Sequence, residues 1–359
     1  MKQYHDLLRE ILVNGEVQYE PRTQERILGI PGAQYDFDVG EGFPLVTTRQ
    51  IFPRLAFEEL FWKLRGERNV KSLSDRNVNY WNANAFQVHL RRSGLDSVFK
   101  KHSREWEAEF EKYNERLTKD PEFAEEAGDL GPIYGFQWRH WPRSEGGEVD
   151  QLENLLNGLR ERPGSRYHIL NSWNPGDLPD MAIGPCPFWH QFTVHGDKLD
   201  LHMVQRSCDV LLGVPYNDAQ DSALLHMIAQ EAELEPRRFI HTFINVHAYL
   251  GVPPRADFWM DSENVGKFQD MVDRVVKRED YLSVREWYLE NAPQEDELNE
   301  GKDHIPTILT QLSKEPKKLP TIAIVDIPLF EAIQLSAKEV LTVKDYNYHK
   351  WDSKARMAV

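Results

Sequence analysis

The sequence predicts an α+β fold in which helices pack on one large mixed β-sheet. In the second half of the chain, four candidate strands follow one another closely, at 167–173, 188–196, 198–213 and 239–250. Several of them alternate apolar and polar residues, as a strand with one packed face and one open face does. Residues 217–234 form an expected helix between the last two strands. At 359 residues, the chain is long enough for one large domain.

The other elements follow in chain order. Residues 3–14 predict an amphipathic helix, 33–39 alternate as a strand, and 54–66 form a helix that ends at a glycine. Residues 84–127 are rich in Lys and Glu, with aromatic residues at helical spacing, and predict a helical insertion attached to the main domain. The acidic segment 291–303 is expected to be an exposed loop. We therefore predict a single domain spanning the whole chain, 1–359.

Charge and composition exclude several classes of protein. A formal net charge of −15 argues against general binding to nucleic acids or to anionic membranes, which require a basic face. No stretch approaches the roughly 18 apolar residues of a membrane span, and the N-terminus lacks the apolar segment of a signal peptide. The two cysteines, Cys186 and Cys208, are therefore expected to be free thiols of a cytoplasmic protein. No residue pattern indicates a metal site.

Cys186 is the first candidate for chemistry. It lies between Pro185 and Pro187, where a loop is expected to enter the sheet. A lone cysteine is often a small buried apolar residue. A nucleophilic thiolate would need a neighbouring cation, and Arg206, on a candidate neighbouring strand, could provide one.

The strand at 239–250 carries an unusual polar face. Its period of two places His241, Asn245, His247 and Tyr249 on the same side. This side could be a solvated sheet face or the wall of a ligand cavity. The spacing of His247 and Tyr249 could direct both side chains at one polar group, such as a sugar hydroxyl.

Further candidates are charged. Arg22, Arg166 and Arg206 each lie beside a turn or a strand end, and together they could bind a phosphate group through their planar guanidinium groups. Glu59 has Lys63 four residues later on the same helix. This pair could be an exposed salt bridge worth a few tenths of a kcal/mol, or Glu59 could be a buried acid or base.

Five blocks of sequence, in this order and at these intervals, resemble the folate-dependent thymidylate synthase family and its relatives, the pyrimidine nucleotide hydroxymethylases. The blocks are EGFPLVTTRQ (41–50), FEELFWKLRGERN (57–69), GDLGPIYGFQWRHW (128–141), QRSCDVLLGVPYN (205–217) and VHAY (246–249). The resemblance covers nearly the whole chain apart from the helical insertion. The five blocks together are highly specific, although each of them alone would not be.

The resemblance implies a homodimer formed across the sheets, with a nucleotide and 5,10-methylenetetrahydrofolate as substrates and no metal. It implies catalytic roles for Cys186, Glu59, Arg206 and Tyr134. It implies nucleotide-binding roles for Arg22, Ser207, Asn217, His247 and Tyr249, with Arg166 donated across the dimer. On the folate side it implies Trp81, Asp209 and the terminal Val359.

The chemistry agrees with these roles. Addition of the Cys186 thiolate to C6 of uracil makes C5 nucleophilic, and the amide of Asn217 can pair with O4 and the N3 proton, which favours dUMP. Hydride transfer would then give dTMP, whereas addition of water would give 5-hydroxymethyl-dUMP, and exclusion of water decides between them. We predict the synthase, with the hydroxymethylase as the alternative. A non-catalytic nucleotide- or RNA-binding relative is a further alternative, although it would have no use for the thiol.

Some residues depart from the pattern of the family. Four of them lie near expected site residues: Pro187, Tyr167, Ile244 and Asn245. Pro187 replaces the usual histidine, and Tyr167 replaces the second arginine of a phosphate-binding pair. Ile244 is expected to reshape the cavity wall beside the nucleotide. An added acid at Asp218 or Asp221 could hold a water at the site, which would favour hydroxymethylation.

Overall fold

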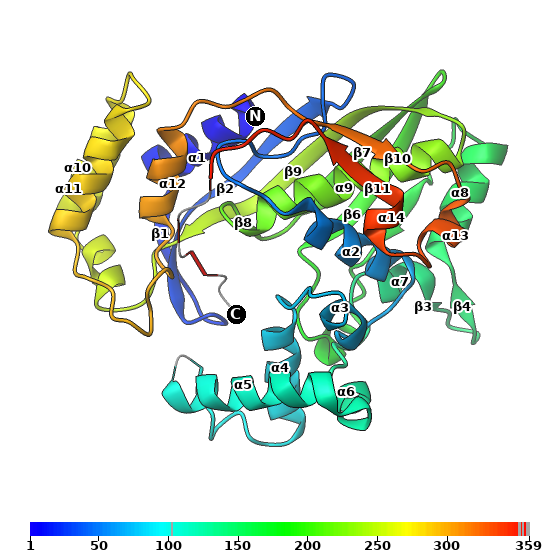
Figure 1. Cartoon of the computed structure of the whole chain (residues 1–359), viewed down its shortest axis with the longest axis horizontal. Helices are drawn as coiled ribbons and strands as arrows, with labels where there is room; N and C mark the ends of the chain where they lie inside the picture. The colour runs from blue at the N-terminus through cyan, green and yellow to red at the C-terminus, as the bar shows by residue number, and fades with distance from the viewer. Residues whose placement is uncertain (102, 351–352, 354, 357–359) are drawn as a thin grey trace.

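The computed structural model describes residues 1–101, 103–350, 353, 355 and 356. Its centre is a seven-stranded sheet in the order β1-β2-β9-β7-β6-β5, with β8 also paired to β9 (Figure 1). The strands are β1 (Glu16–Glu20), β2 (Glu25–Asp38), β5 (Ile169–Asn171), β6 (Pro187–His195), β7 (Lys198–Gln205), β8 (Cys208–Asp209) and β9 (Glu235–Tyr249). Strands β7 and β8 run parallel to β9, while the other neighbours are antiparallel. The predicted large mixed sheet is therefore confirmed.

Helices surround this sheet. The main ones are α1 (Lys2–Asn14), α2 (Pro53–Leu64), α8 (Gln151–Glu161), α9 (Gly213–Glu231), α10 (Ser262–Asp273), α11 (Asp280–Asn291) and α12 (Ile305–Leu312). Shorter helices are α3 (Lys71–Ser74), α7 (Gly135–Arg139), α13 (Leu329–Ala332), α14 (Ala337–Val340), η1 (Leu178–Asp180) and η2 (Arg255–Met260). Two small two-stranded sheets pair β3 (Trp141–Pro142) with β4 (Glu148–Val149) and β10 (Thr321–Ile324) with β11 (Leu341–Lys344). No helix in the described part of the chain is long and apolar enough to cross a membrane.

The predicted strand at 198–213 is wrong in its second half. Strand β7 ends at Gln205, the chain turns at Arg206 and Ser207, and only Cys208–Asp209 pair again, as β8. Gly213 already begins α9, and Pro215 lies in the first turn of this helix, where a missing N–H costs no hydrogen bond. The break matters because it brings Ser207 and Asp209 to the cavity described below.

Residues 82–127 form three helices, α4 (Asn82–Arg92), α5 (Arg104–Lys119) and α6 (Pro121–Ala127), which lie apart from the sheet in Figure 1. Ser103 and Asp120 cap α5 and α6 by accepting hydrogen bonds from backbone N–H groups. The helices share their own aromatic contacts, in which the ring of Phe86 lies 5.2 Å from that of Trp106 and 5.1 Å from that of Tyr113. That these helices are an insertion into the family fold stays a prediction.

Strand β9 separates two environments. Phe239, His241 and Phe243 are buried, while Thr242 is half-buried and Ile244 is exposed. This alternation follows from the pleat of the strand, which directs successive side chains to opposite faces. The predicted polar face is thus split, because His241 lies in the core, whereas His247 and Tyr249 reach a cavity.

Candidate active site

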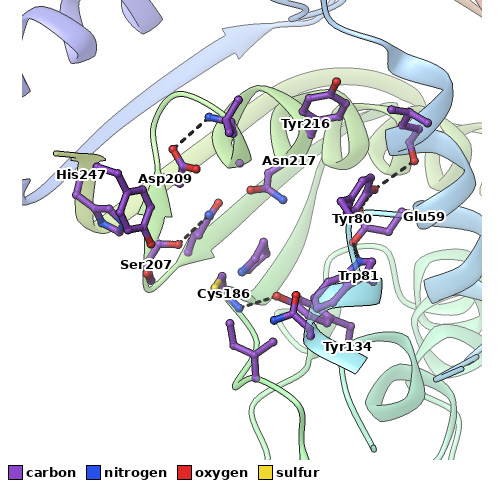
Figure 2. Close-up of a pocket in the computed structure, with 18 of the residues that line it drawn as sticks. Glu59, Tyr80, Trp81, Tyr134, Cys186, Ser207, Asp209, Tyr216, Asn217 and His247 are labelled. Atoms are coloured by element: carbon purple, nitrogen blue, oxygen red, sulfur yellow. Dashed lines mark hydrogen bonds between the residues drawn. The ribbon is translucent and has the colours of Figure 1, made fainter. Parts of the chain in front are cut away.

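A cavity of about 400 Å³ lies among α2, α4, α9 and the ends of the central strands, and it gathers most of the predicted site residues (Figure 2). Ten of them line it: Arg22, Glu59, Trp81, Tyr134, Cys186, Ser207, Asp209, Asn217, His247 and Tyr249. Residues more than 200 positions apart in sequence therefore share one hollow. In Figure 2, Glu59 and Trp81 form one end of the cavity, Asp209 and His247 form the other, and Cys186 lies between them.

Cys186 is half-buried at the point where the loop enters β6, so the predicted position is confirmed. The Nη2 atom of Arg206 lies 3.9 Å from its Sγ atom, and Arg206 Nε donates a hydrogen bond to the carbonyl of Pro185 at 2.9 Å. Arg206 is in place because Gln205, at the end of β7, pairs with Pro187, the first residue of β6. A positive charge thus faces the atom that would carry the negative charge of a thiolate.

Tyr134 supports the cysteine from the other side. Its hydroxyl accepts a hydrogen bond from the backbone N–H of Cys186 at 3.0 Å, which Figure 2 marks with a dashed line. Burial raises the pKa of Tyr134 well above its ordinary value, with a further contribution from the neighbouring Cys186. Its backbone φ is +41°, a conformation that is strained for a residue with a side chain. This strain fits a side chain whose position is fixed by its surroundings.

Glu59 lies on α2 and is only 6% exposed, so it is not the surface ion pair that its spacing from Lys63 would also have allowed. Its carboxylate accepts hydrogen bonds from Tyr80 Oη at 2.5 Å, Trp81 Nε1 at 3.0 Å and Gln220 Nε2 at 3.1 Å. Lys63 Nζ completes the set at 3.2 Å. Four donors from three helical regions therefore fix the orientation of this carboxylate at the cavity wall.

The opposite end of the cavity is built around Asp209. Its Oδ1 atom accepts hydrogen bonds from the backbone N–H groups of Leu211 and Leu212, at 3.0 and 3.1 Å, and lies 3.6 Å from His304 Nδ1. Burial opposes the charge of Asp209, but His304 and the N–H of Leu212 outweigh it and lower its pKa. Burial likewise opposes the charge of His304, yet the carboxylate of Asp209 and the carbonyl of Arg356 raise its pKa.

His247 and Tyr249 lie on β9, where His247 pairs with Asp209 of the adjacent strand β8. The centroids of the His247 and Tyr249 rings lie 5.3 Å apart. Burial lowers the pKa of His247, although its Nδ1 atom bonds the carbonyl of Asn245 at 2.8 Å. Burial also raises the pKa of Tyr249 above its ordinary value. At neutral pH both side chains are uncharged groups that can exchange hydrogen bonds with a hydroxyl.

Arg22 lies at the turn between β1 and β2, and its carbonyl accepts a hydrogen bond from Lys101 Nζ at 3.3 Å. Burial, followed by the charge of Arg22, lowers the pKa of Lys101 to about 8. Lys101 belongs to the predicted insertion, so this segment reaches the rim of the cavity. The sequence analysis missed Lys101, and nothing in its local pattern distinguishes it from the many other lysines of that segment.

Several expectations are wrong or lie outside the cavity. Ile244 is 45% exposed on the far face of the sheet and does not reshape the cavity wall, because the pleat turns it away. Asp218 and Asp221 are buried behind the cavity against His241 and His190, so neither can hold a water in it. Arg166 is exposed before β5 and is not part of the lining.

Two further predicted site residues are Arg206 and Val359. Arg206 contacts Cys186 without lining the cavity itself. Val359 lies outside the described residues, whereas Ala355, near the C-terminal end, does line the cavity. Within the described residues, no group of three or more His, Cys, Asp and Glu side chains is arranged to hold a metal ion.

The fold and the site define a protein with a free cysteine thiol and a buried carboxylate in one cavity, and comparison with known proteins identifies its family. The model of the thymidylate synthase family matches residues 2–359. The thymidylate synthase of Listeria monocytogenes serotype 4b (strain CLIP80459) is 40% identical over 263 residues, covering 69% of this chain and 82% of that protein. The thymidylate synthase of Mesoplasma florum is 39% identical over 251 residues, covering 70% and 82%. The chain therefore belongs to the thymidylate synthase family.

Proposed function

We propose that this protein methylates dUMP at C5 to give dTMP, with Cys186 as the nucleophile. The observation that carries the proposal is the position of Cys186 at the cavity, 3.9 Å from the guanidinium group of Arg206 and supported by Tyr134. Membership of the thymidylate synthase family supports this reaction for the arrangement. The reaction is proposed to take place in the cytoplasm, where reducing conditions keep the thiol free.

In the proposed mechanism, Cys186 Sγ bonds to C6 of the uracil ring, and the electron pair of the C5–C6 double bond moves toward C5 and O4. The co-substrate 5,10-methylenetetrahydrofolate supplies the one-carbon unit and the hydride. C5 bonds to the one-carbon unit and loses its proton, and the bond between that carbon and the folate nitrogen then breaks. Hydride from the resulting tetrahydrofolate completes the methyl group and leaves dihydrofolate. Glu59, held by four donors at the cavity wall, is the group that we assign to proton movement at C5 and O4. Release of the sulfur from C6 restores the double bond.

The nucleotide would lie with its base toward Asn217, whose amide can both donate to O4 and accept from the N3 proton. Its deoxyribose hydroxyl would face His247 and Tyr249. Arg22 and Ser207 line the same cavity and are assigned to the phosphate. Arg206 would serve both the phosphate and the cysteine.

We infer from the side chains of the cavity wall that hydride, rather than water, completes the reaction. Trp81 lines the cavity and donates to Glu59, so it presents an aromatic face beside the proposed proton-transfer group. The acids that could have held a water, Asp218 and Asp221, are sealed behind the cavity. Family membership agrees with the methyl product, and the hydroxymethylase alternative is not favoured.

We further propose a homodimer in which each cavity receives Arg166 from the partner subunit. This assignment is supported by the exposure of Arg166 outside the cavity of its own chain. Tyr167, which follows it, is 87% exposed, and Ile244 is exposed on the outer face of the sheet. Large exposed apolar groups of this kind are expected where two copies of a sheet pack together.

The test is to incubate the purified protein with dUMP and 5,10-methylenetetrahydrofolate and to measure dTMP. Cys186→Ser should abolish turnover while it still binds dUMP, because the hydroxyl is a much weaker nucleophile. Cys208→Ala is the matched control, since Cys208 is the other thiol and is buried outside the cavity. A protein that binds dUMP but forms no methylated product would contradict the proposal.

A further inference from the structure

Helix α2 buries a lysine beside the carboxylate that we assign to proton transfer. Lys63 lies one helical turn after Glu59, is 3% exposed and lines the cavity. A buried ammonium group is costly unless charged or polar partners surround it. The partners of Lys63 therefore indicate why the chain carries it here.

The ammonium group has three partners, and all three belong to the cavity region. Its Nζ atom donates to Gln220 Oε1 at 2.5 Å and lies 3.2 Å from Glu59 Oε1. It also lies 4.4 Å from the centroid of the Tyr134 ring, within the range of a cation–π contact. Lysine has three donor protons, so these contacts use its bonding capacity in full.

These partners connect the two reactive groups of the site. Tyr134 accepts the hydrogen bond from the backbone N–H of Cys186, and Glu59 is the buried carboxylate. Lys63 is thus one contact away from the nucleophile and in direct contact with the carboxylate. It lies between the two groups that must act on neighbouring atoms of the same ring.

Gln220 explains how the lysine is held. Its amide oxygen accepts from Lys63, while its Nε2 atom donates to the carbonyl of Ala56 at 3.0 Å and to Glu59 Oε2 at 3.1 Å. One side chain of α9 therefore connects the backbone, the acid and the lysine of α2.

We propose that Lys63 is a positioning residue for the methylation reaction, fixing the Glu59 carboxylate and the Tyr134 ring relative to Cys186. The inference rests on the proposed function. Lys63 acts through its protein contacts, with Gln220 as its support, and not through a contact with the nucleotide phosphate. Its removal should therefore slow turnover more than it weakens nucleotide binding.

The test is a double-mutant cycle of Lys63→Met and Glu59→Gln, with kcat and KM for dUMP measured for all four proteins. Lys63→Met should lower kcat by about 10- to 100-fold, because small displacements of catalytic groups have effects of this size. Its KM for dUMP should change by less than about threefold. In the Glu59→Gln background, the same substitution should lower kcat by a smaller factor, since one of the two groups that it positions is already lost.

Lys71→Met is the matched control, because Lys71 also pairs with a carboxylate four residues away, Asp75, but lies outside the cavity. Its kcat should stay within about twofold of the wild type, as expected for an exposed pair. If Lys63→Met does not fold, the cycle is run with Lys63→Met/Gln220→Met, which removes both partners and leaves neither of them unpaired.

An unchanged kcat in the first variant, or an equal loss of kcat in both Glu59 backgrounds, would overturn the inference. The proposed function fails separately, when the wild type itself forms no dTMP. A wild type that forms dTMP beside an unaffected Lys63→Met variant would contradict only the role of Lys63.

Discussion

The two sides of α9 carry polar residues of similar type, but one side faces the cavity and the other faces the sheet. Asn217 lines the cavity, and Gln220, three residues later, donates to the Glu59 carboxylate in the cavity wall. Asp218 and Asp221, also three residues apart, face the sheet, where Asp218 Oδ1 lies 2.8 Å from His241 Nδ1 and Asp221 Oδ1 lies 3.0 Å from His190 Nε2. The helical period of 3.6 residues separates the two pairs. Burial and charge alone therefore do not identify a functional acid, whereas access to the cavity does.

The sealed acid has a structural task. Asp218 Oδ2 accepts a hydrogen bond from the hydroxyl of Tyr35, and its Oδ1 atom is hydrogen-bonded to His241 Nδ1. The second ring nitrogen of His241 lies 3.0 Å from Gln205 Oε1. Burial is the main cause that raises the pKa of Asp218 above its ordinary value. This network joins α9 to β2, β7 and β9 behind the cavity, so it stabilises the cavity wall without touching a substrate.

The largest expected effect comes from the cavity side. Glu59→Gln keeps the shape of the side chain but removes the proton-transfer group, so kcat should fall by about 10²- to 10⁴-fold. Steady-state kinetics with dUMP would measure this loss. Asp221→Asn, the same chemical change on the sealed side, should leave kcat per folded molecule within about threefold. Similar losses in both variants would contradict the distinction between the two sides.

The next effect concerns the choice of base. Asn217→Asp should shift the ratio of kcat/KM from dUMP toward dCMP by about 10- to 100-fold, because a carboxylate accepts from the cytosine amino group and cannot donate to O4 of uracil. Parallel assays with the two nucleotides would measure the ratio. An unchanged preference would show that the base is read elsewhere in the cavity.

On the sealed side, the expected effect is on stability. Asp218→Asn should lower the free energy of unfolding by about 1 to 3 kcal/mol, since one buried donor of Tyr35 or His241 loses its acceptor. Urea denaturation would measure the change, and kcat per folded molecule should stay within about twofold. A stable variant with a strongly reduced kcat would instead place Asp218 in the reaction.

The smallest effect is a pH dependence at the boundary between cavity and core. Because the folded state raises the pKa of His304 above 6.5, its stabilising contribution is complete below pH 6.5 and is lost as the pH rises through the folded pKa. Asp209, whose pKa is lowered, stays ionised throughout this range. The stability advantage of the wild type over His304→Asn, measured by urea denaturation, should therefore be larger at pH 6 than at pH 9. A constant or growing advantage would contradict this assignment.

Much of the fold follows from local patterns. The helix at 3–14 is α1, the strand at 239–250 overlaps β9, which starts earlier and ends at Tyr249, and the helix at 217–234 is α9 with an earlier start and end. The strand at 33–39 proved to be the end of the much longer β2. Its first half, which includes glycine and proline residues, is held by pairing with β9, and local alternation does not show such pairing.

The cavity was predictable where family blocks covered it, as for Tyr134, Asn217 and His247. The network around Glu59 was not, because the spacing of Glu59 and Lys63 gives their pairing but not their burial. Gln220 was not among the predicted site residues, and Asp218 was predicted only as an added acid that could hold a water. Projecting α9 on its helical period would have separated them, since one faces α2 and the other faces β9. Predicting the position of Lys101 would have required knowing how its distant segment folds back onto the β1–β2 turn.

The proposed synthase differs from the hydroxymethylase in that a hydride, rather than water, completes the reaction at the Cys186 site. The most direct measurement is the mass of the nucleotide formed from dUMP and 5,10-methylenetetrahydrofolate by the wild-type protein. The expected product of the wild-type protein is dTMP, and the Cys186→Ser variant should form no product. A product heavier than dTMP by one oxygen atom, or recovery of unchanged dUMP, would contradict it.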